Sequence, residues 1–107
     1  MNEKEELIFG LKRWLKKGVD YLKDKSPEEL MKDELTFDAL CFVFLMIKDI
    51  TNRILSYPEL LKRHSNVNFI EIKDLYYDVF IKDGCNVYLM HEYIKNKFPH
   101  FIEELNK

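Results

Sequence analysis

The sequence predicts an all-α fold, a compact bundle of four main helices joined by short helical turns. Apolar residues recur every three or four positions along almost the whole chain, which is the spacing of helices that bury one face. The chain has 107 residues, of which 47% are hydrophobic and 34% charged, with only three glycines and three prolines. That length suits one domain with one core, so we expect residues 1–107 to form a single helical domain.

The first predicted helix runs from about Glu3 to Lys23, with the basic pattern KRxxKK on its solvent side. A second, short helix follows. Ser26 can cap it, Pro27 suits its first position, and Glu29 completes a capping box, so we expect it to end near residue 33. The predicted core side of the first helix comprises Ile8, Leu11, Leu15, Val19 and Leu22.

The third predicted helix begins at Thr36 or Phe37 and ends near Leu55. Its middle, ALCFVFLMI, is apolar on every face, so we expect it to be buried nearly all round. Two interpretations remain open. The helix is either the centre of the core, or part of it faces a second subunit.

A short helical turn is predicted to begin at Pro58, and a fourth main helix follows it. Asn68 and Glu71 repeat the pattern of a capped helix start. We expect this helix to end near the pair Asp83 and Gly84. Its predicted core side comprises Phe69, Ile72, Tyr76 and Val79.

The last predicted helix is capped by Asn86 and kinked by Pro99, because proline cannot donate a backbone hydrogen bond and its ring collides with the preceding turn. No stretch shows the alternation typical of a strand. The predicted core side of this helix comprises Val87, Met90, Ile94, Phe101 and Leu105.

Composition limits the classes of partner and compartment. The formal net charge is −2, which gives no general electrostatic case for nucleic acid or membrane, although a local basic patch is compatible with it. The longest apolar run is far shorter than the roughly 18 residues of a membrane span, so we expect none. Cys41 and Cys85 lack C-x-x-C spacing, and we interpret them as reduced thiols of a cytoplasmic protein.

The sequence contains none of the common catalytic or cofactor motifs. There is no phosphate loop, dinucleotide fingerprint, H-E-x-x-H or paired-cysteine pattern, so we expect no metal and no cofactor. The three histidines, His64, His91 and His100, are scattered along the chain.

Three stretches, taken in order, resemble a known family. They are YLKDKSPEELMKDELTFDAL, IKDITNRILSYPELLKRHSNVNFIEI and GCNVYLMHEYIKNKFPHFIEEL. Their order and spacing are similar to the HepT-like branch of the HEPN superfamily, small helical proteins encoded beside minimal nucleotidyltransferases in bacteria and archaea. The resemblance covers nearly the whole chain.

The resemblance implies a metal-independent endoribonuclease whose R-x-x-x-x-H motif lies before the glycine turn and meets its copy across a two-fold dimer. A histidine moves the proton of the attacking 2'-hydroxyl or of the leaving oxygen, and an arginine holds the scissile phosphate. In members regulated as toxins, a tyrosine of the motif receives adenylate from the partner nucleotidyltransferase.

This chain departs from that motif. Counted back from Gly84, the arginine position falls on Leu75 and the histidine position on Phe80; with a gap of one residue they fall on Tyr76 and Ile81. Neither register restores the pair. The motif's tyrosine falls on Lys82 or Asp83.

A second departure lies on the central helix. The family often carries R-N-x-E there, and these positions read Phe42, Val43 and Leu45. We therefore predict an apolar cleft and no catalytic residues.

Two functional hypotheses follow. The favoured one is a non-catalytic member of a toxin–antitoxin-type pair that forms a homodimer through Phe42, Phe44 and Leu45 and binds a minimal nucleotidyltransferase or another HEPN chain. The alternative is an active RNA-binding or RNA-cleaving protein, because tyrosine can stack on bases and lysine can hold phosphate. The same tyrosines can equally lie at the edge of the core. The residues of the alternative site are Tyr76, Tyr77, Asp78 and Lys82.

Overall fold

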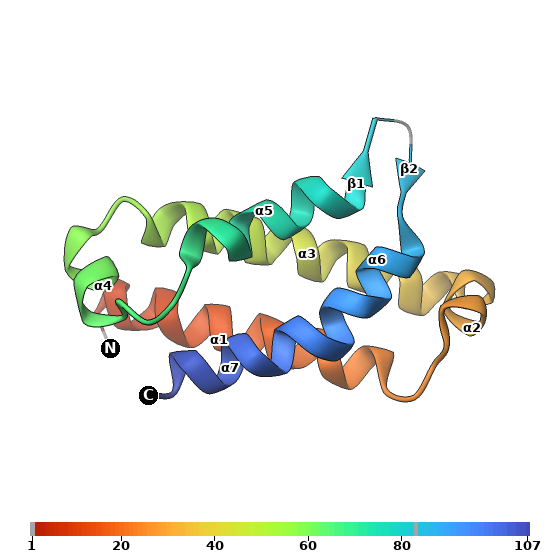
Figure 1. Cartoon of the computed structure of the whole chain (residues 1–107), viewed down its shortest axis with the longest axis horizontal. Helices are drawn as coiled ribbons and strands as arrows, with labels where there is room; N and C mark the ends of the chain where they lie inside the picture. Colours follow the sequence, from red (N-terminus) through yellow and green to blue (C-terminus); the bar gives the residue numbers. More distant parts are fainter. Residues whose placement is uncertain (1, 83) are drawn as a thin grey trace.

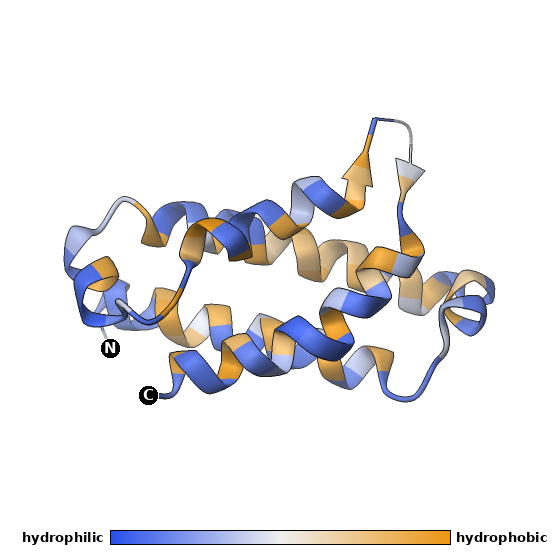
Figure 2. Cartoon of the chain, viewed as in Figure 1, coloured by the Kyte–Doolittle hydropathy of each residue, from blue (hydrophilic) through white to orange (hydrophobic). Residues whose placement is uncertain are grey.

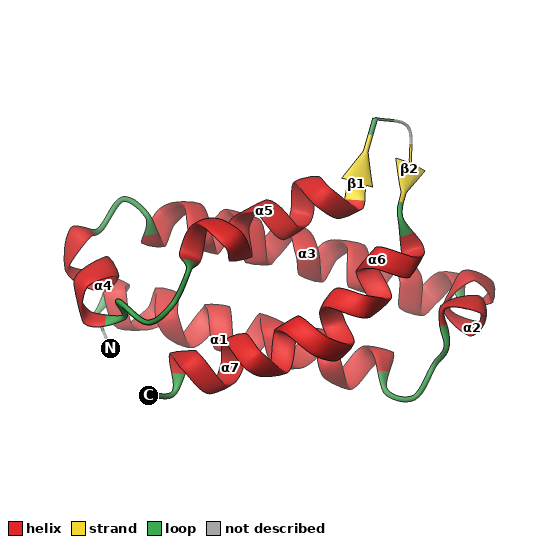
Figure 3. Cartoon of the chain, in the orientation of Figure 1, coloured by secondary structure: helices red, strands yellow, loops and turns green. Residues whose placement is uncertain are grey.

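The computed structural model describes residues 2–82 and 84–107 and is built on two long antiparallel helices, α1 (Glu3–Leu22) and α3 (Glu34–Ile54) (Figure 1). Helix α5 (Phe69–Val79) packs on α3. The C-terminal rod packs on α1 and consists of α6 (Val87–Glu92), the π-helical segment η1 (Tyr93–Lys97) and α7 (Phe98–Leu105). These four units confirm the predicted all-α bundle (Figure 3). Within the described residues, no helix is long and apolar enough to span a membrane.

Short helices α2 (Pro27–Lys32) and α4 (Pro58–Arg63) connect the long ones. The capping box before α2 is formed as predicted, because the Glu29 amide donates to Ser26 Oγ at 3.1 Å and the Ser26 amide donates to Glu29 Oε1 at 3.0 Å. Helix α3 begins earlier than predicted. Its cap is Asp33, whose carboxylate accepts from the amide and the hydroxyl of Thr36 at 3.1 and 2.7 Å.

The core lies between α1, α3, α5 and the C-terminal rod. Gly18 of α1 lies against the ring of Phe98 in α7, and a Cβ at Gly18 would come within 2.6 Å of that ring. Val19, which the sequence assigned to the core side, is only partly buried. A glycine at position 18 therefore sets how closely α1 and the C-terminal rod approach.

Helix α3 is apolar along most of its length (Figure 2), but it is not buried all round as expected. Phe42 is 51% exposed, whereas Phe44 is 1% exposed. The Phe44 ring packs against those of Phe80 and Phe98, with centroids 6.2 and 5.3 Å apart. The assignment of Phe44 to a dimer interface is therefore wrong, because its side chain fills the core of its own chain.

The end of α5 also differs from the prediction. The helix stops at Val79, and Phe80–Ile81 (β1) pairs with Gly84–Cys85 (β2) in a two-residue antiparallel hairpin. The extended backbone at Phe80 turns its ring toward the core, and the amide of Asn86 closes the base of the hairpin by donating to the Val79 carbonyl at 2.8 Å. The expectations that the helix reaches residue 84 and that no strand forms are both corrected. Asp83 lies outside the described residues.

Asparagine caps begin α5 and α6 as predicted. Asn68 accepts from the Glu71 amide at 3.0 Å, and Asn86 accepts from the Leu89 amide at 3.1 Å. Near Pro99, where the sequence predicts a kink, the structure contains the π-helical segment η1, which ends two residues before the proline. A proline ring collides with the carbonyl four residues earlier, and a π-helical turn widens the helix at that point.

Candidate functional site

An open pocket of about 380 Å³ lies between α3 and α5, at the end of the bundle that carries the hairpin. One acidic side chain, Asp38, borders it. The other lining side chains are apolar or aromatic, and we call them the α3–α5 surface: Cys41, Phe42, Leu45, Tyr76 and Phe80.

Helical spacing explains why α3 presents these side chains together. Residues three, four and seven positions apart share one face, and Asp38, Phe42 and Leu45 follow that spacing. Leu35, one turn earlier on the same stripe, is 84% exposed. This face of α3, apolar except for Asp38, thus continues beyond the pocket into solvent.

The two tyrosines lie together at the last turn of α5. The Tyr76 ring packs 4.8 Å from that of Phe80, and the Tyr77 ring meets Tyr76 edge-on at 5.4 Å. Lys48 of α3 covers them, with its Nζ 4.5 Å from the Tyr76 centroid and 5.9 Å from that of Tyr77. Sequence reasoning missed Lys48, although its place three residues after Leu45 puts it on the same side of α3.

Asp78 and Lys82 do not join the tyrosines in one cluster. Asp78 accepts a hydrogen bond from the hydroxyl of Tyr93 at 2.9 Å, on the C-terminal rod. Burial and that bond raise the pKa of Tyr93 to about 12. Lys82 is exposed in the hairpin that follows β1, off the helix altogether. The residues of the predicted alternative site therefore point to different neighbours.

Each histidine has neighbours of its own. His91 Nε2 lies 2.8 Å from the Lys25 carbonyl oxygen, and His100 Nε2 lies 3.2 Å from Glu104 Oε1. His64 ends α4, where its Nδ1 is buried without a hydrogen-bond partner. Among residues 2–82 and 84–107, no group of His, Cys, Asp or Glu side chains is suited to hold a metal ion.

The two cysteines are free, and neither has the properties of a catalytic nucleophile. Burial raises the pKa of the Cys41 thiol to about 11, with smaller contributions from Cys85 and Asp38. Burial also raises the pKa of Cys85. Because the thiolate is the reactive form, both side chains act here as packing groups.

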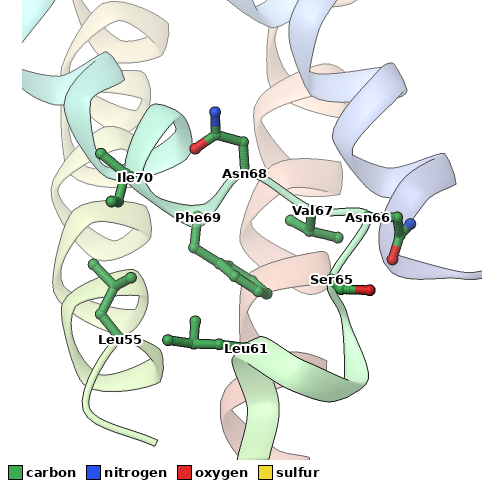
Figure 4. A pocket seen from close by; sticks show the side chains of 8 residues that line it. All are labelled: Leu55, Leu61, Ser65, Asn66, Val67, Asn68, Phe69 and Ile70. Carbon is green, nitrogen blue, oxygen red and sulfur yellow. The ribbon is translucent and has the colours of Figure 1, made fainter. Parts of the chain in front are cut away.

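A larger pocket of about 470 Å³ lies at the opposite end of α5 (Figure 4). Figure 4 shows the Phe69 ring projecting into it toward Leu61. Its lining includes no acidic, basic or histidine side chain. Two of its amides serve the fold, since Asn68 caps α5 and Asn66 donates to the Glu104 carbonyl at 2.8 Å. The side chains that line this pocket therefore pack or cap helices, and none of them is an acid or base suited to proton transfer.

Comparison of the chain with known protein families, with curated proteins and with solved structures finds no match.

Proposed function

We propose that this chain is a non-catalytic HepT-like HEPN protein that forms a homodimer and docks a protein partner through the α3–α5 surface. The observation that carries the proposal is the open apolar pocket beside Phe42 and Leu45. The family resemblance assigns the ribonuclease cleft to these positions. An apolar pocket there favours a protein partner over a phosphodiester.

Exposed side chains at the pocket or next to its lining support docking: Phe42 lines it, Tyr77 contacts the lining residue Tyr76, and Ile81 follows the lining residue Phe80 in β1. Phe42 is 51% exposed, Tyr77 55% and Ile81 60%. Large apolar and aromatic side chains gathered in one region of a surface are typical of protein interfaces, where tyrosine and other aromatics supply contact area at a low cost in side-chain entropy. Asp38, which lines the pocket, would contribute to a polar rim.

Local charge argues against RNA at this surface. Lys48 is the cation over the tyrosine rings, and Asp49 Oδ1 lies 3.7 Å from its Nζ. Asp38 borders the pocket itself. A polyanion gains affinity from several cations that follow its backbone, and this arrangement does not supply them. The lysine over two tyrosine faces favours the alternative of a rearranged ribonuclease.

The first partner we propose is a second copy of the chain. In a two-fold dimer the same patch meets itself, so the face of α3 from Leu35 to Leu45 would be covered by its own copy. A minimal nucleotidyltransferase is the second partner, proposed on the family resemblance. It would complete a pair of the toxin–antitoxin type.

Sedimentation velocity at micromolar concentration tests the dimer, which should have twice the mass of one chain. Phe42→Asp should give the mass of a monomer, because it places a charge in the apolar contact. The matched control is Phe9→Asp on α1, where the phenylalanine is 56% exposed. It makes the same chemical change on another face and should leave the dimer intact. A parent protein that is monomeric at micromolar concentration contradicts the proposal.

A further inference from the structure

A second open groove, of about 400 Å³, lies between α1 and α7, which are antiparallel neighbours (Figure 1). None of the residues that line it belongs to the α3–α5 surface. Its lining combines three cations, two apolar side chains and one amide. We call this set the α1–α7 groove: Phe9, Lys12, Arg13, Lys16, Ile102 and Asn106.

Helix geometry places the three cations on one side of α1. Lys12, Arg13 and Lys16 follow Phe9 at offsets of three, four and seven residues, so all four lie on the face beside α7. Ile102 and Asn106, four residues apart, form the corresponding face of α7. The result is a row of positive charge beside an apolar strip.

The positive charge of this region extends beyond α1. Burial, followed by the charges of Arg63 and Lys12, holds the pKa of His64 below its ordinary value. Arg63, at the end of α4, and Lys12 therefore both contribute positive potential at His64. Lys16 has an acidic neighbour, Asp20, at 3.3 Å. That pair is largely exposed, and exposed ion pairs yield easily to a competing anion.

An aromatic side chain lies at one end of this row of cations. Phe9 is 56% exposed although it is fully apolar. A basic groove that carries an exposed aromatic ring is the arrangement that binds single-stranded nucleic acid, since cations follow the phosphates while bases stack on the ring. An acidic peptide would use the cations and leave Phe9 unused.

We propose that the α1–α7 groove binds a short single-stranded nucleic acid. Lys12, Arg13 and Lys16 hold successive phosphates, and Phe9 stacks on a base. Asn106, at the end of the groove, offers both a donor and an acceptor to a base edge.

The test is fluorescence anisotropy of the full chain with a labelled oligouridylate of about ten nucleotides, within the range of sites bound by single small domains. With three phosphate contacts, the plot of log K against log salt should have a slope of about −2. Replacing all three cations with glutamine should remove most of this slope and weaken binding at low salt by about tenfold or more. Phe9→Ala should weaken binding at least about fivefold, because stacking is lost while every charge remains.

The matched control carries Lys23→Gln, Lys32→Gln and Lys73→Gln, which change the net charge equally and lie outside the groove. It should bind like the parent protein, and circular dichroism should show that all variants are folded. Equal losses in both triple variants would mean that only net charge matters, and would overturn the proposal. Polyglutamate that competes as well as the oligonucleotide, together with full binding by Phe9→Ala, would overturn it as well.

Discussion

The two surfaces each present an exposed phenylalanine, Phe42 at 51% and Phe9 at 56%, in opposite surroundings. Phe42 lies beside an apolar pocket, and its ring contacts Trp14 edge-on at 5.5 Å. Phe9 lies beside three cations. Exposure of an aromatic ring alone therefore does not identify a partner. The charge of its neighbours distinguishes a surface for protein from a surface for phosphate.

The distinction between a protein-binding and a phosphate-binding surface would fail most clearly if the α3–α5 surface cleaved RNA. We predict no useful cleavage, because general acid–base catalysis contributes about 10²–10⁴-fold and a positioned phosphate clamp a comparable factor. Neither a histidine nor an arginine is among the residues that line the pocket of this surface. A mixed RNA pool, incubated with purified protein with and without chelator, checks this.

The companion variant carries Tyr76→Phe, Tyr77→Phe and Lys82→Ala. Metal-independent cleavage by the parent protein that disappears in this variant would turn the α3–α5 surface into an active site. Cleavage that persists equally in both would instead indicate a contaminating nuclease.

A smaller effect separates the two surfaces directly. Phe42→Asp should weaken the dimer by about thirtyfold or more, as expected when a central aromatic contact worth about 2 kcal/mol is lost. The same variant should keep the affinity of the parent protein for the short oligonucleotide, which is too short to bridge two grooves. If folded Phe42→Asp lost both dimerisation and oligonucleotide binding, the two surfaces would have to be regarded as one site.

The α1–α7 groove depends on a close helix approach that the α3–α5 surface does not need. In Gly18→Ala the new Cβ would lie 2.6 Å from the Phe98 ring, and such overpacking costs about 1–3 kcal/mol. Urea unfolding should show this loss of stability. Oligonucleotide binding should weaken under conditions where the dimer persists.

Gly10→Ala provides the control on the same helix. Its new Cβ would meet Ile50 Cδ1 at 3.4 Å, which is an ordinary contact. This substitution should be neutral or stabilising by up to about 1 kcal/mol, because alanine favours helix over glycine. Equal destabilisation by both variants would contradict the role given to the contact at Gly18.

The smallest predicted effect is a dependence of stability on pH through His64. Its pKa in the folded chain lies below the ordinary value of 6.5, because of burial and the charges of Arg63 and Lys12. The unfolded chain therefore binds the proton first, and the free energy of unfolding should fall as the pH drops through 6.5 and level off below the folded pKa.

Urea titrations at several pH values measure this fall, and His64→Gln should flatten it. His100→Gln is the control, since His100 lies beside Glu104 on α7. Bound oligonucleotide should reduce the dependence, because phosphates near Lys12 offset the positive field. An unchanged dependence in His64→Gln would show that another group is responsible.

Local signals were readable in the sequence, and contacts between distant segments were not. Ser26, Asn68 and Asn86 cap their helices through hydrogen bonds to residues three positions away, so the helix starts could be predicted. The hairpin after α5 was missed. Its apolar residues fit a helix equally well, and the contact of Phe80 with Phe44 lies far away in the sequence.

The candidate surfaces could be predicted only in part, because they too depend on contacts between distant segments. Because the middle of α3 is apolar at every position, its sequence has no hydrophobic periodicity that identifies the outward face. The sequence therefore places both Phe42 and Phe44 at an interface, whereas in the structure only Phe42 of the two is exposed. The basic pattern of α1 was visible in the sequence. Its pairing with Ile102 and Asn106 depends on how α1 and α7 pack, which no local pattern reports.

The π-helical segment before Pro99 has a consequence for chain length. A π-helical turn is equivalent to one extra residue in an α-helix, so the rod can lose a residue between positions 93 and 97 and keep the same sides of α6 and α7 toward α1. A deletion inside α7 would instead rotate every later residue by about 100° and turn Leu105 out of the core. Single-residue gaps in homologous sequences should therefore gather at residues 93–97.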